Sequence, residues 1–168
     1  MVKRKKSLTP QGWYKSPTAG KVHYQSGYEK KFMEWLDSKK IPWEKCRERF
    51  LYTALDGKEH RYNPDFYLPE PKLYVEVKGM VRANDPLKFQ YFPENKKLVL
   101  LGFLELQKLG LDVKDPTAGK VKKLEPGVWP YNLLQQMPDF LKAGEMTEEL
   151  KKKVDSFAFF EYIKNIAR

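Results

Sequence analysis

Residues 62–79 read YNPDFYLPEPKLYVEVKG, which is the pattern of two strands joined by a turn. Segments 62–68 and 73–78 are rich in aromatic and β-branched residues, which favour strands. The four residues between them include two prolines, and proline is typical of turns. The stretch therefore predicts a β-hairpin with residues 69–72 as its loop.

A loop of this length sets the register of the hairpin. It pairs Leu68 with Leu73, Phe66 with Val75, Asp65 with Glu76, and Asn63 with Lys78. The first two pairs form an apolar face, and the last two form a polar face that carries the charges. Like charges directly opposite each other destabilise a sheet unless something compensates them, and a hard cation between Asp65 and Glu76 would do so.

The cation predicted for this site is Mg²⁺ or Mn²⁺. Both ions prefer carboxylate oxygens, whereas the single cysteine and two histidines of the chain argue against a zinc site. Lys78 lies two residues from Glu76 and so shares its face of the strand. Its amine would point at whatever the metal binds, which is an arrangement suited to cutting a phosphodiester.

A purely structural role for these charges is the alternative. Glu76 and Lys78 alternate with valine, and that is also the ordinary pattern of a half-solvated sheet. Pro64 favours the functional interpretation. Proline cannot donate to a sheet ladder, so it implies a bulge or break in the strand, and bulges are frequent beside active sites.

The remaining pattern predicts an α/β fold. Helices are expected at 27–39, 85–91 and 103–109, and strands at 49–55, 62–68, 73–78 and 97–101. Asp56-Gly57 is a strong signal for a two-residue hairpin turn, so the first three strands are expected to form an antiparallel meander. The short apolar strand 97–101 is expected to be buried, central and parallel to a neighbour.

The C-terminal third of the chain is predicted to be mostly helical. Segments 131–141 and 147–166 have helical patterns, and the second carries an apolar stripe. The stripe consists of Leu150, Val154, Phe157 and Phe160, widened by Phe159, Ile163 and Ile166. Such a broad face favours packing on the core, with a dimer contact as the alternative. Segment 115–119 reads as the loop that leads into this region.

The order of three motifs resembles a known nuclease superfamily. Glu29 in a helix, then Pro64-Asp65, then Glu76-x-Lys78, is similar to the PD-(D/E)XK nucleases. Within that superfamily the segments SGYE (26–29), YNPDF (62–66) and VEVKG (75–79) most resemble the phage endonuclease I family of Holliday-junction resolving enzymes. They are also similar to the catalytic domain of the endonuclease subunit of Tn7-type transposons. The resemblance covers about residues 24 to 103.

This resemblance implies a fold, a reaction and a set of roles. The fold would be a restriction-endonuclease-like core of helix, three-stranded antiparallel meander, helix and strand, with a helical C-terminal extension. The reaction would be metal-dependent hydrolysis of DNA that leaves 5′-phosphates. Asp65 and Glu76 would be metal ligands, Glu29 a further carboxylate at the metal, and Lys78 the residue that positions water or stabilises charge. Glu29 also has a purely structural explanation, because Ser26-x-x-Glu29 is a capping box at a helix start.

The charge of the chain agrees with a nucleic-acid partner. The formal net charge is +10, and residues 1–31 contain eight basic residues and one acidic residue. This basic segment is expected to contact DNA phosphates, and aromatic residues interleave with its later charges at Trp13 and Tyr14. The candidate DNA-binding residues are Lys3, Arg4, Lys5, Lys6, Lys15 and Lys21. For residues 3–6, a solvated tail that only aids solubility is the alternative.

Length and composition bound the remaining possibilities. The 168 residues suit one domain, divided here into a basic arm (1–25), a nuclease core (26–113) and a C-terminal extension packed on the core (114–168). One cysteine, no long apolar run and no signal-peptide pattern predict a cytoplasmic protein with no membrane partner. The resemblance implies that the cell is a bacterium or a phage-infected host.

Three functions remain open from the sequence. The first is a phage-type endonuclease that resolves branched DNA, which would require a homodimer to make two symmetric cuts. The second is an endonuclease that cuts transposon ends or duplex DNA as restriction enzymes do. The third is a DNA-binding module without catalysis, although such a module would gain stability by losing the opposed carboxylates.

Overall fold

The structure is a computed structural model that describes residues 11–82, 84–115, 128–130 and 147–166. Its helices are α1 (Gly27–Ser38), α2 (Asp85–Gln90), α3 (Phe103–Lys108), α5 (Glu148–Lys153) and α6 (Phe157–Ile166). Its strands are β1 (Gly12–Ser16), β2 (Gly20–Tyr24), β3 (Glu44–Lys45), β4 (Phe50–Thr53), β5 (Glu59–Tyr62), β6 (Phe66–Leu68), β7 (Leu73–Val77), β8 (Met80–Arg82), β9 (Lys97–Leu101) and β10 (Val128–Pro130). The mixed α/β class predicted from the sequence is confirmed, and none of the described helices has the length and apolar character needed to cross a membrane.

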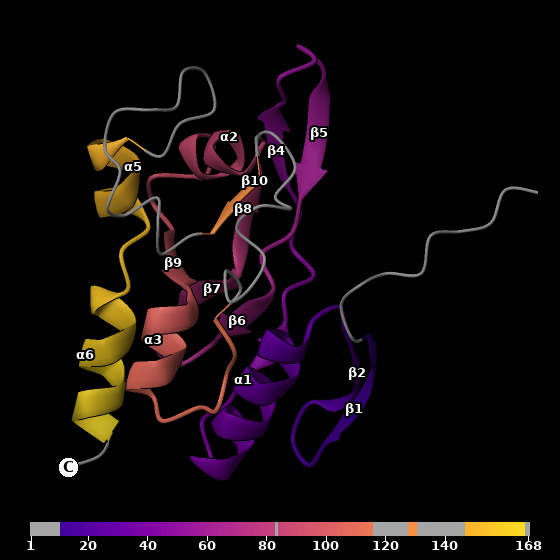
Figure 1. Cartoon of the computed structure of the whole chain (residues 1–168), viewed down its shortest axis with the longest axis vertical. Coiled ribbons are helices and arrows are strands. Elements are labelled where there is room, and N and C mark those ends of the chain that lie inside the picture. Colours follow the sequence, from indigo (N-terminus) through magenta and orange to yellow (C-terminus); the bar gives the residue numbers. More distant parts are fainter. Residues whose placement is uncertain (1–10, 83, 116–127, 131–146, 167–168) are drawn as a thin grey trace, which may run out of the picture.

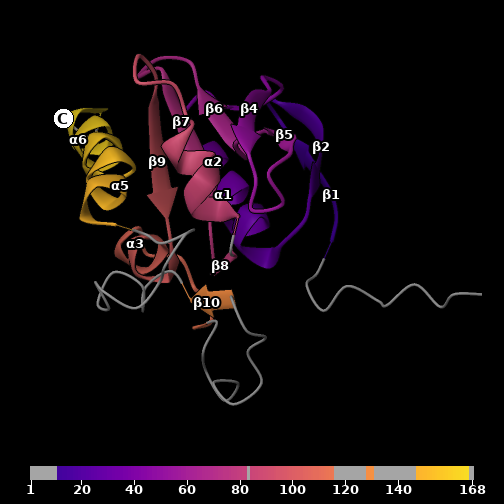
Figure 2. The same ribbon diagram turned by 90° about the horizontal axis from the view of Figure 1, so that it is seen from above.

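A four-stranded sheet with the order β3-β6-β7-β9 forms the centre of the protein (Figure 1). β6 and β7 are antiparallel, and Leu68 pairs with Leu73 and Phe66 with Val75, as the loop length predicts. β9 runs parallel to β7, as expected, but it lies at the end of the sheet order and is not central. All five residues of β7 are buried. β9 pairs with one edge of β7, and helices surround the sheet (Figure 2).

The predicted strand 62–68 is two strands in the structure. β5 ends at Tyr62 and β6 begins at Phe66, so Asn63, Pro64 and Asp65 form a break. Among the described strands β5 pairs only with β4, and the predicted three-stranded meander is therefore wrong. The physical reason is that Pro64 has no N–H to donate to a continuous ladder.

The polar end of the predicted hairpin also differs from its expected register. Asn63 does not face Lys78, because the amide of Asn63 donates to the backbone oxygen of Glu48 (2.8 Å). The backbone N–H of Lys78 donates instead to Leu101 of the neighbouring parallel strand (3.0 Å). The ladder between β6 and β7 thus stops at Phe66 and Val75.

The β4–β5 hairpin is present but has a longer loop than expected. The last strand pair is Thr53 with Glu59, so five residues connect the strands, where a two-residue turn was predicted. Within the loop the N–H of Ala54 donates to the backbone oxygen of Lys58 (3.0 Å), and Gly57 adopts a positive φ of 75° that suits glycine.

The predicted C-terminal helix 147–166 is interrupted. α5 ends before Val154, whose backbone oxygen accepts from the N–H of Leu100 in β9 (2.9 Å), and α6 begins at Phe157. Figures 1 and 2 show both helices beside β9. Phe159 is fully buried and packs on Phe32 of α1, whereas Phe157 is 69% exposed and so does not belong to the inner stripe. The predicted helix 131–141 lies outside the described residues.

Part of the predicted basic arm is folded. β1 and β2 form an antiparallel hairpin that packs beside α1 (Figure 1). The division into an arm, a core and an extension stays a prediction. Lys3, Arg4, Lys5 and Lys6 lie outside the described residues.

Candidate active site

The four candidate residues come from different parts of the chain. Glu29 is in the first turn of α1, Asp65 is the last residue of the break before β6, Glu76 is in β7, and Lys78 follows β7 directly. The fold brings Asp65 and Glu76 into contact, because the backbone N–H of Asp65 donates to Oε2 of Glu76 (3.2 Å). Lys78 reaches the other oxygen of the same carboxylate, with 3.1 Å between Nζ and Oε1 of Glu76.

Asp65 lies in a negative environment. Burial raises its pKa well above the ordinary value, and the charges of Glu76 and Glu29 raise it further, against the opposing effect of Lys78 and Lys45. Its Oδ2 accepts from the backbone N–H of Val77 (2.8 Å), which fixes the carboxyl group against β7. Among the described residues no hydrogen-bond donor contacts the other oxygen, Oδ1. This oxygen of the half-buried carboxyl group could therefore bind a cation.

Glu76 is held by a tyrosine that sequence reasoning missed. The hydroxyl of Tyr62 donates to Oε2 of Glu76 (2.9 Å), and both side chains are buried. Tyr62 is the last residue of β5. The break at Pro64 therefore places the end of the β4–β5 hairpin beside the carboxylate of Glu76 in the β6–β7 hairpin. No local pattern around Tyr62 predicts this contact, because its two partners are 14 residues apart in the sequence.

Lys78 lies between two carboxylates, and the second was also missed. Its Nζ is 3.4 Å from Oδ2 of Asp85, the first residue of α2, which is almost fully buried. Asp85 further accepts from the backbone N–H of Arg82 (2.7 Å) and from Nζ of Lys88 (2.8 Å). Burial lowers the pKa of Lys78, but the charges of Glu76, Asp85 and Asp65 outweigh this and hold that pKa above its ordinary value. Lys78 is therefore a cation at neutral pH.

Glu29 caps its helix and also faces the site. Its backbone N–H donates to Oγ of Ser26 (3.2 Å), which is half of the predicted capping box. Its own carboxylate accepts from the backbone N–H of Gln25 (3.2 Å), and Nζ of Lys45 in β3 forms an ion pair with it (3.2 Å). The charge of the buried Glu29 also raises the pKa of Asp65. The capping contact is therefore present, and a role of Glu29 at a metal site stays a prediction.

The chemistry of these donors fits a hard divalent cation. The cluster offers oxygen donors from three acids that share one electrostatic environment, and its only cysteine neighbour, Cys46, has a thiol whose pKa burial raises to about 11. Within the described part of the chain, no three acidic, histidine or cysteine side chains already converge on a single point. The carboxylates are instead occupied by lysines, a tyrosine and backbone N–H groups. A cation would exchange some of these partners.

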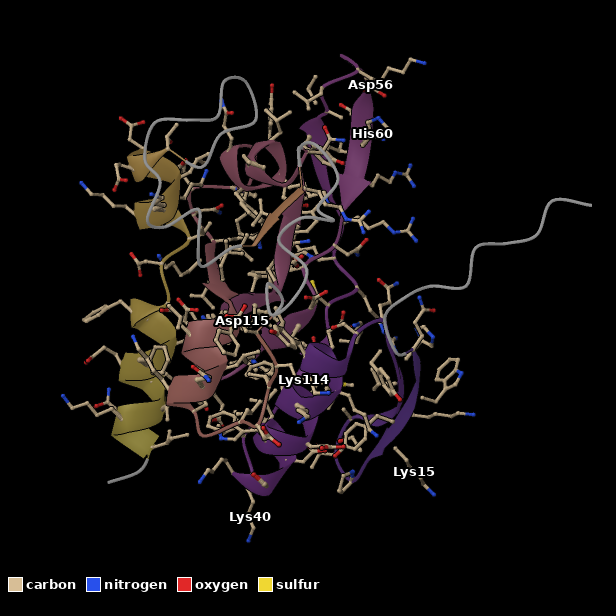
Figure 3. The ribbon with its side chains drawn as sticks, viewed as in Figure 1. Lys15, Lys40, Asp56, His60, Lys114 and Asp115 are labelled. Atoms are coloured by element: carbon tan, nitrogen blue, oxygen red, sulfur yellow. The ribbon has the colours of Figure 1, made fainter. Side chains whose placement is uncertain are left out.

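The candidate DNA-binding residues within the described part lie on the β1–β2 hairpin. Trp13, Lys15 and Lys21 are exposed, and Figure 3 shows Lys15 pointing away from the molecule. Tyr14 was expected to join them, but its hydroxyl donates to Oδ2 of Asp37 on α1 (2.6 Å). Alternation along the strand turns Tyr14 to the inner face, opposite to Trp13 and Lys15, and its DNA contact stays a prediction.

The family model for phage endonuclease I matches residues 11–96, just over half of the 168 residues. The chain belongs to the phage endonuclease I family. The match spans α1, the break at Pro64, β7 and α2, so all of the clustered residues lie inside it. No curated protein and no solved structure matches the chain significantly. Membership of the phage endonuclease I family implies a nuclease with DNA as its substrate.

Proposed function

We propose that this protein is a Mg²⁺- or Mn²⁺-dependent endonuclease of the PD-(D/E)XK type that cuts branched DNA, such as a four-way junction, and leaves 5′-phosphates. The observation that carries the proposal is that Asp65 and Lys78 both contact the carboxylate of Glu76, while the charge of Glu29 acts on Asp65. These residues come from separate elements and stand in the order that the resemblance requires. The alternation of a solvated strand does not explain them, because Glu76 is buried.

Each site residue would have a distinct role in the reaction. Asp65, Glu76 and Glu29 would hold the metal ion, which would supply charge neutralisation at the phosphate and a more acidic water. Lys78 would place its ammonium against the phosphate or the attacking water, because Glu76 and Asp85 hold it in a fixed position beside the carboxylates. Tyr62 would orient Glu76 through its hydrogen bond.

The arrangement of the core supports a restriction-endonuclease-like fold. α1 supplies Glu29, the antiparallel pair β6 and β7 supplies the central carboxylates, and α2 leads into the parallel strand β9. The order of helix, antiparallel strands, helix and strand is the one that the resemblance implies. The separate β4–β5 hairpin is the departure from it.

A junction-resolving substrate has consequences for assembly and for affinity. Two symmetric cuts in a four-way junction need two active sites related by a two-fold axis, so we propose a homodimer. Lys3, Arg4, Lys5 and Lys6 would lie along the phosphates, and Lys15 and Lys21 would extend this basic surface. A phage enzyme of this kind would act in the cytoplasm of the infected bacterial cell.

A panel of labelled DNA tests the proposal. Linear, nicked, forked and four-way DNA of matched sequence is incubated with the protein in Mg²⁺ and in EDTA. We expect cleavage of the four-way junction in Mg²⁺ alone, 5′-phosphate products, and tighter binding of the junction than of linear duplex at the same salt concentration. Equal affinity for the two would refute branch selectivity.

Two other outcomes identify the competing functions. A monomer that cuts linear duplex as fast as the junction would indicate the transposon-end or restriction-type activity. Binding to all four DNA forms without cleavage in Mg²⁺ or Mn²⁺ would indicate a DNA-binding module that lacks catalysis.

A further inference from the structure

The outer face of the β1–β2 hairpin combines an exposed aromatic ring with positive charge. Trp13 is 62% exposed, and Nζ of Lys21 lies 5.0 Å from the centre of its ring. The register places His23 opposite Trp13 and Lys15 opposite Lys21, so these four side chains share one face. The rings of Trp13 and His23 meet edge to face at 5.1 Å.

The inner face anchors this hairpin firmly to α1. Asp37 accepts hydrogen bonds from Tyr14 (2.6 Å) and Ser16 (3.1 Å) of the hairpin, and from the indole of Trp43 (2.8 Å). Val22 packs into the core from the second strand. Burial raises the pKa of Asp37, but these hydrogen bonds outweigh it and hold that pKa below its ordinary value. The outer face is thus a preorganised surface.

Two features of this surface are costly when nothing is bound. Lys15 and Lys21 are directly opposite each other, and like charges in that position destabilise a sheet. Among the described residues no carboxylate forms an ion pair with either lysine. The Trp13 side chain also stays 62% exposed, although Lys21 and His23 each contact its ring. Phosphates would compensate the lysines, and an aromatic partner would cover the ring, so a nucleic acid satisfies both features at once.

The hairpin also leads directly into the candidate active site. β2 ends at Tyr24, and the next residue, Gln25, donates its backbone N–H to the carboxylate of Glu29. His23, the partner of Trp13, lies two residues before Gln25, which is about 7 Å at the rise of a strand. Trp13 is therefore at the end of the hairpin nearest the carboxylates, and Lys15 and Lys21 lie farther along it.

The geometry points to a binding surface for single-stranded DNA beside the cutting site, where one unpaired base stacks on Trp13 and its neighbouring phosphates contact Lys15 and Lys21. The inference rests on the proposed function for the identity of the nucleic acid. An unpaired base is required, because in a duplex the faces of the bases are stacked on one another and only their edges reach a protein surface. Strands that leave the duplex at a branch would provide such bases.

Binding in EDTA tests the base contact separately from cleavage. We compare Trp13→Ala, Trp13→Phe and a matched control, Tyr91→Ala, which removes an exposed aromatic residue at the end of α2. The ligands are a labelled single strand, a blunt duplex and the same duplex with a single-stranded flap. Trp13→Ala should weaken binding of the single strand and the flapped duplex about tenfold, with little effect on the blunt duplex. Trp13→Phe should retain most of the affinity, and Tyr91→Ala all of it.

Salt dependence tests the two lysines. The double variant Lys15→Ala/Lys21→Ala should lower the slope of log Kd against log salt by about 1.4 for the single strand, which is about 0.7 for each phosphate contact. The matched control Lys58→Ala/Lys152→Ala removes two exposed lysines from other surfaces and should leave the slope unchanged. Circular dichroism and thermal unfolding confirm that each variant is folded.

Two results would overturn the inference. One is equal loss of single-strand and blunt-duplex affinity in Trp13→Ala, which would indicate a general backbone contact. The other is unchanged single-strand affinity in both Trp13→Ala and the double lysine variant. Neither result affects the proposed function, because metal-dependent cleavage by the unaltered protein is measured independently.

Discussion

At the scale of single residues, the carboxylates Asp65 and Glu76 are the most direct test of the site. We expect Asp65→Asn or Glu76→Gln to reduce cleavage in Mg²⁺ to background, because each change removes a charged oxygen ligand. DNA affinity in EDTA should persist, since positive charge elsewhere supplies it. Product formation on the four-way junction and anisotropy of labelled DNA measure the two effects.

The stability of the same variants separates a functional from a structural role. The amide oxygens of Asn and Gln can still accept the hydrogen bonds from Val77 and Tyr62. Removing the charge of Asp65 should relieve its repulsion with Glu76, so metal-free Asp65→Asn should be as stable as the original protein or slightly more stable. Glu76→Gln also loses the ion pair with Lys78 and should be less stable. A loss of several kcal/mol in urea unfolding of Asp65→Asn would contradict the site and favour a structural role.

Lys78 should affect the rate of cleavage more than binding. Its ammonium contacts Glu76 and Asp85 in the free protein and would contact developing charge in the reaction. We expect Lys78→Ala to lower kcat by about a hundredfold or more, the usual size for the loss of one such electrostatic contact, while Kd for DNA changes less than about threefold. Equal losses in rate and affinity would make Lys78 an ordinary phosphate contact.

Asp85 should contribute to the stability of the fold. Asp85 is buried and forms ion pairs with Lys88 and Lys78. Asp85→Asn should therefore cost about 2–3 kcal/mol of unfolding free energy. This cost is less than for a fully buried pair, because the lysines are partly exposed.

The same residue should make stability depend on pH. Burial raises the pKa of Asp85, but the lysines outweigh this and lower it. A lowered pKa stabilises the fold above the unfolded-state value, about 3.9, and that stability is lost as the pH falls below it. Urea unfolding between pH 3 and 7 should therefore show a smaller acid loss in Asp85→Asn than in the original protein.

At the scale of secondary-structure elements, two phenylalanines of α6 form a matched pair. Phe159 is fully buried against Phe32 and Trp35 of α1, whereas Phe157 is 69% exposed. We expect Phe159→Ala to cost about 3–5 kcal/mol, because it leaves a cavity between the two helices. Phe157→Ala should change the free energy of unfolding by less than about 0.5 kcal/mol. Equal effects, measured by urea unfolding, would mean that α6 does not dock on α1 through Phe159.

At the scale of the whole molecule, the N-terminal residues can be separated from the fold. β1 begins at Gly12, so deletion of residues 1–10 leaves the hairpin intact. We expect the truncated protein to unfold at the same temperature and to bind DNA more weakly with a smaller salt dependence, because four basic residues are lost. The metal requirement of cleavage should not change. An unchanged salt slope would show that this segment does not contact phosphates.

Features that depend on local signals could be predicted from the sequence. Ser26 and the apolar spacing behind it define the start and face of α1, which spans Gly27–Ser38 against the predicted 27–39. The prolines in 69–72 define the β6–β7 register, because a loop of known length fixes which residues pair. The order of Glu29, Asp65, Glu76 and Lys78 was also visible in the sequence, and the family match covers all four.

Other features depend on contacts between distant segments, which only the folded chain brings together. Pro64 itself breaks the strand, but tertiary packing pairs β5 with β4 and β6 with β3, because each strand takes the hydrogen-bonding partner that packing places beside it. The same packing brought Tyr62 to Glu76, Lys45 to Glu29, and Asp85 to Lys78. It also ended α5 before Val154, whose backbone oxygen accepts a hydrogen bond from Leu100 of β9. No periodicity or turn residue encodes such contacts, since their free energy comes from groups that meet only after the chain has folded.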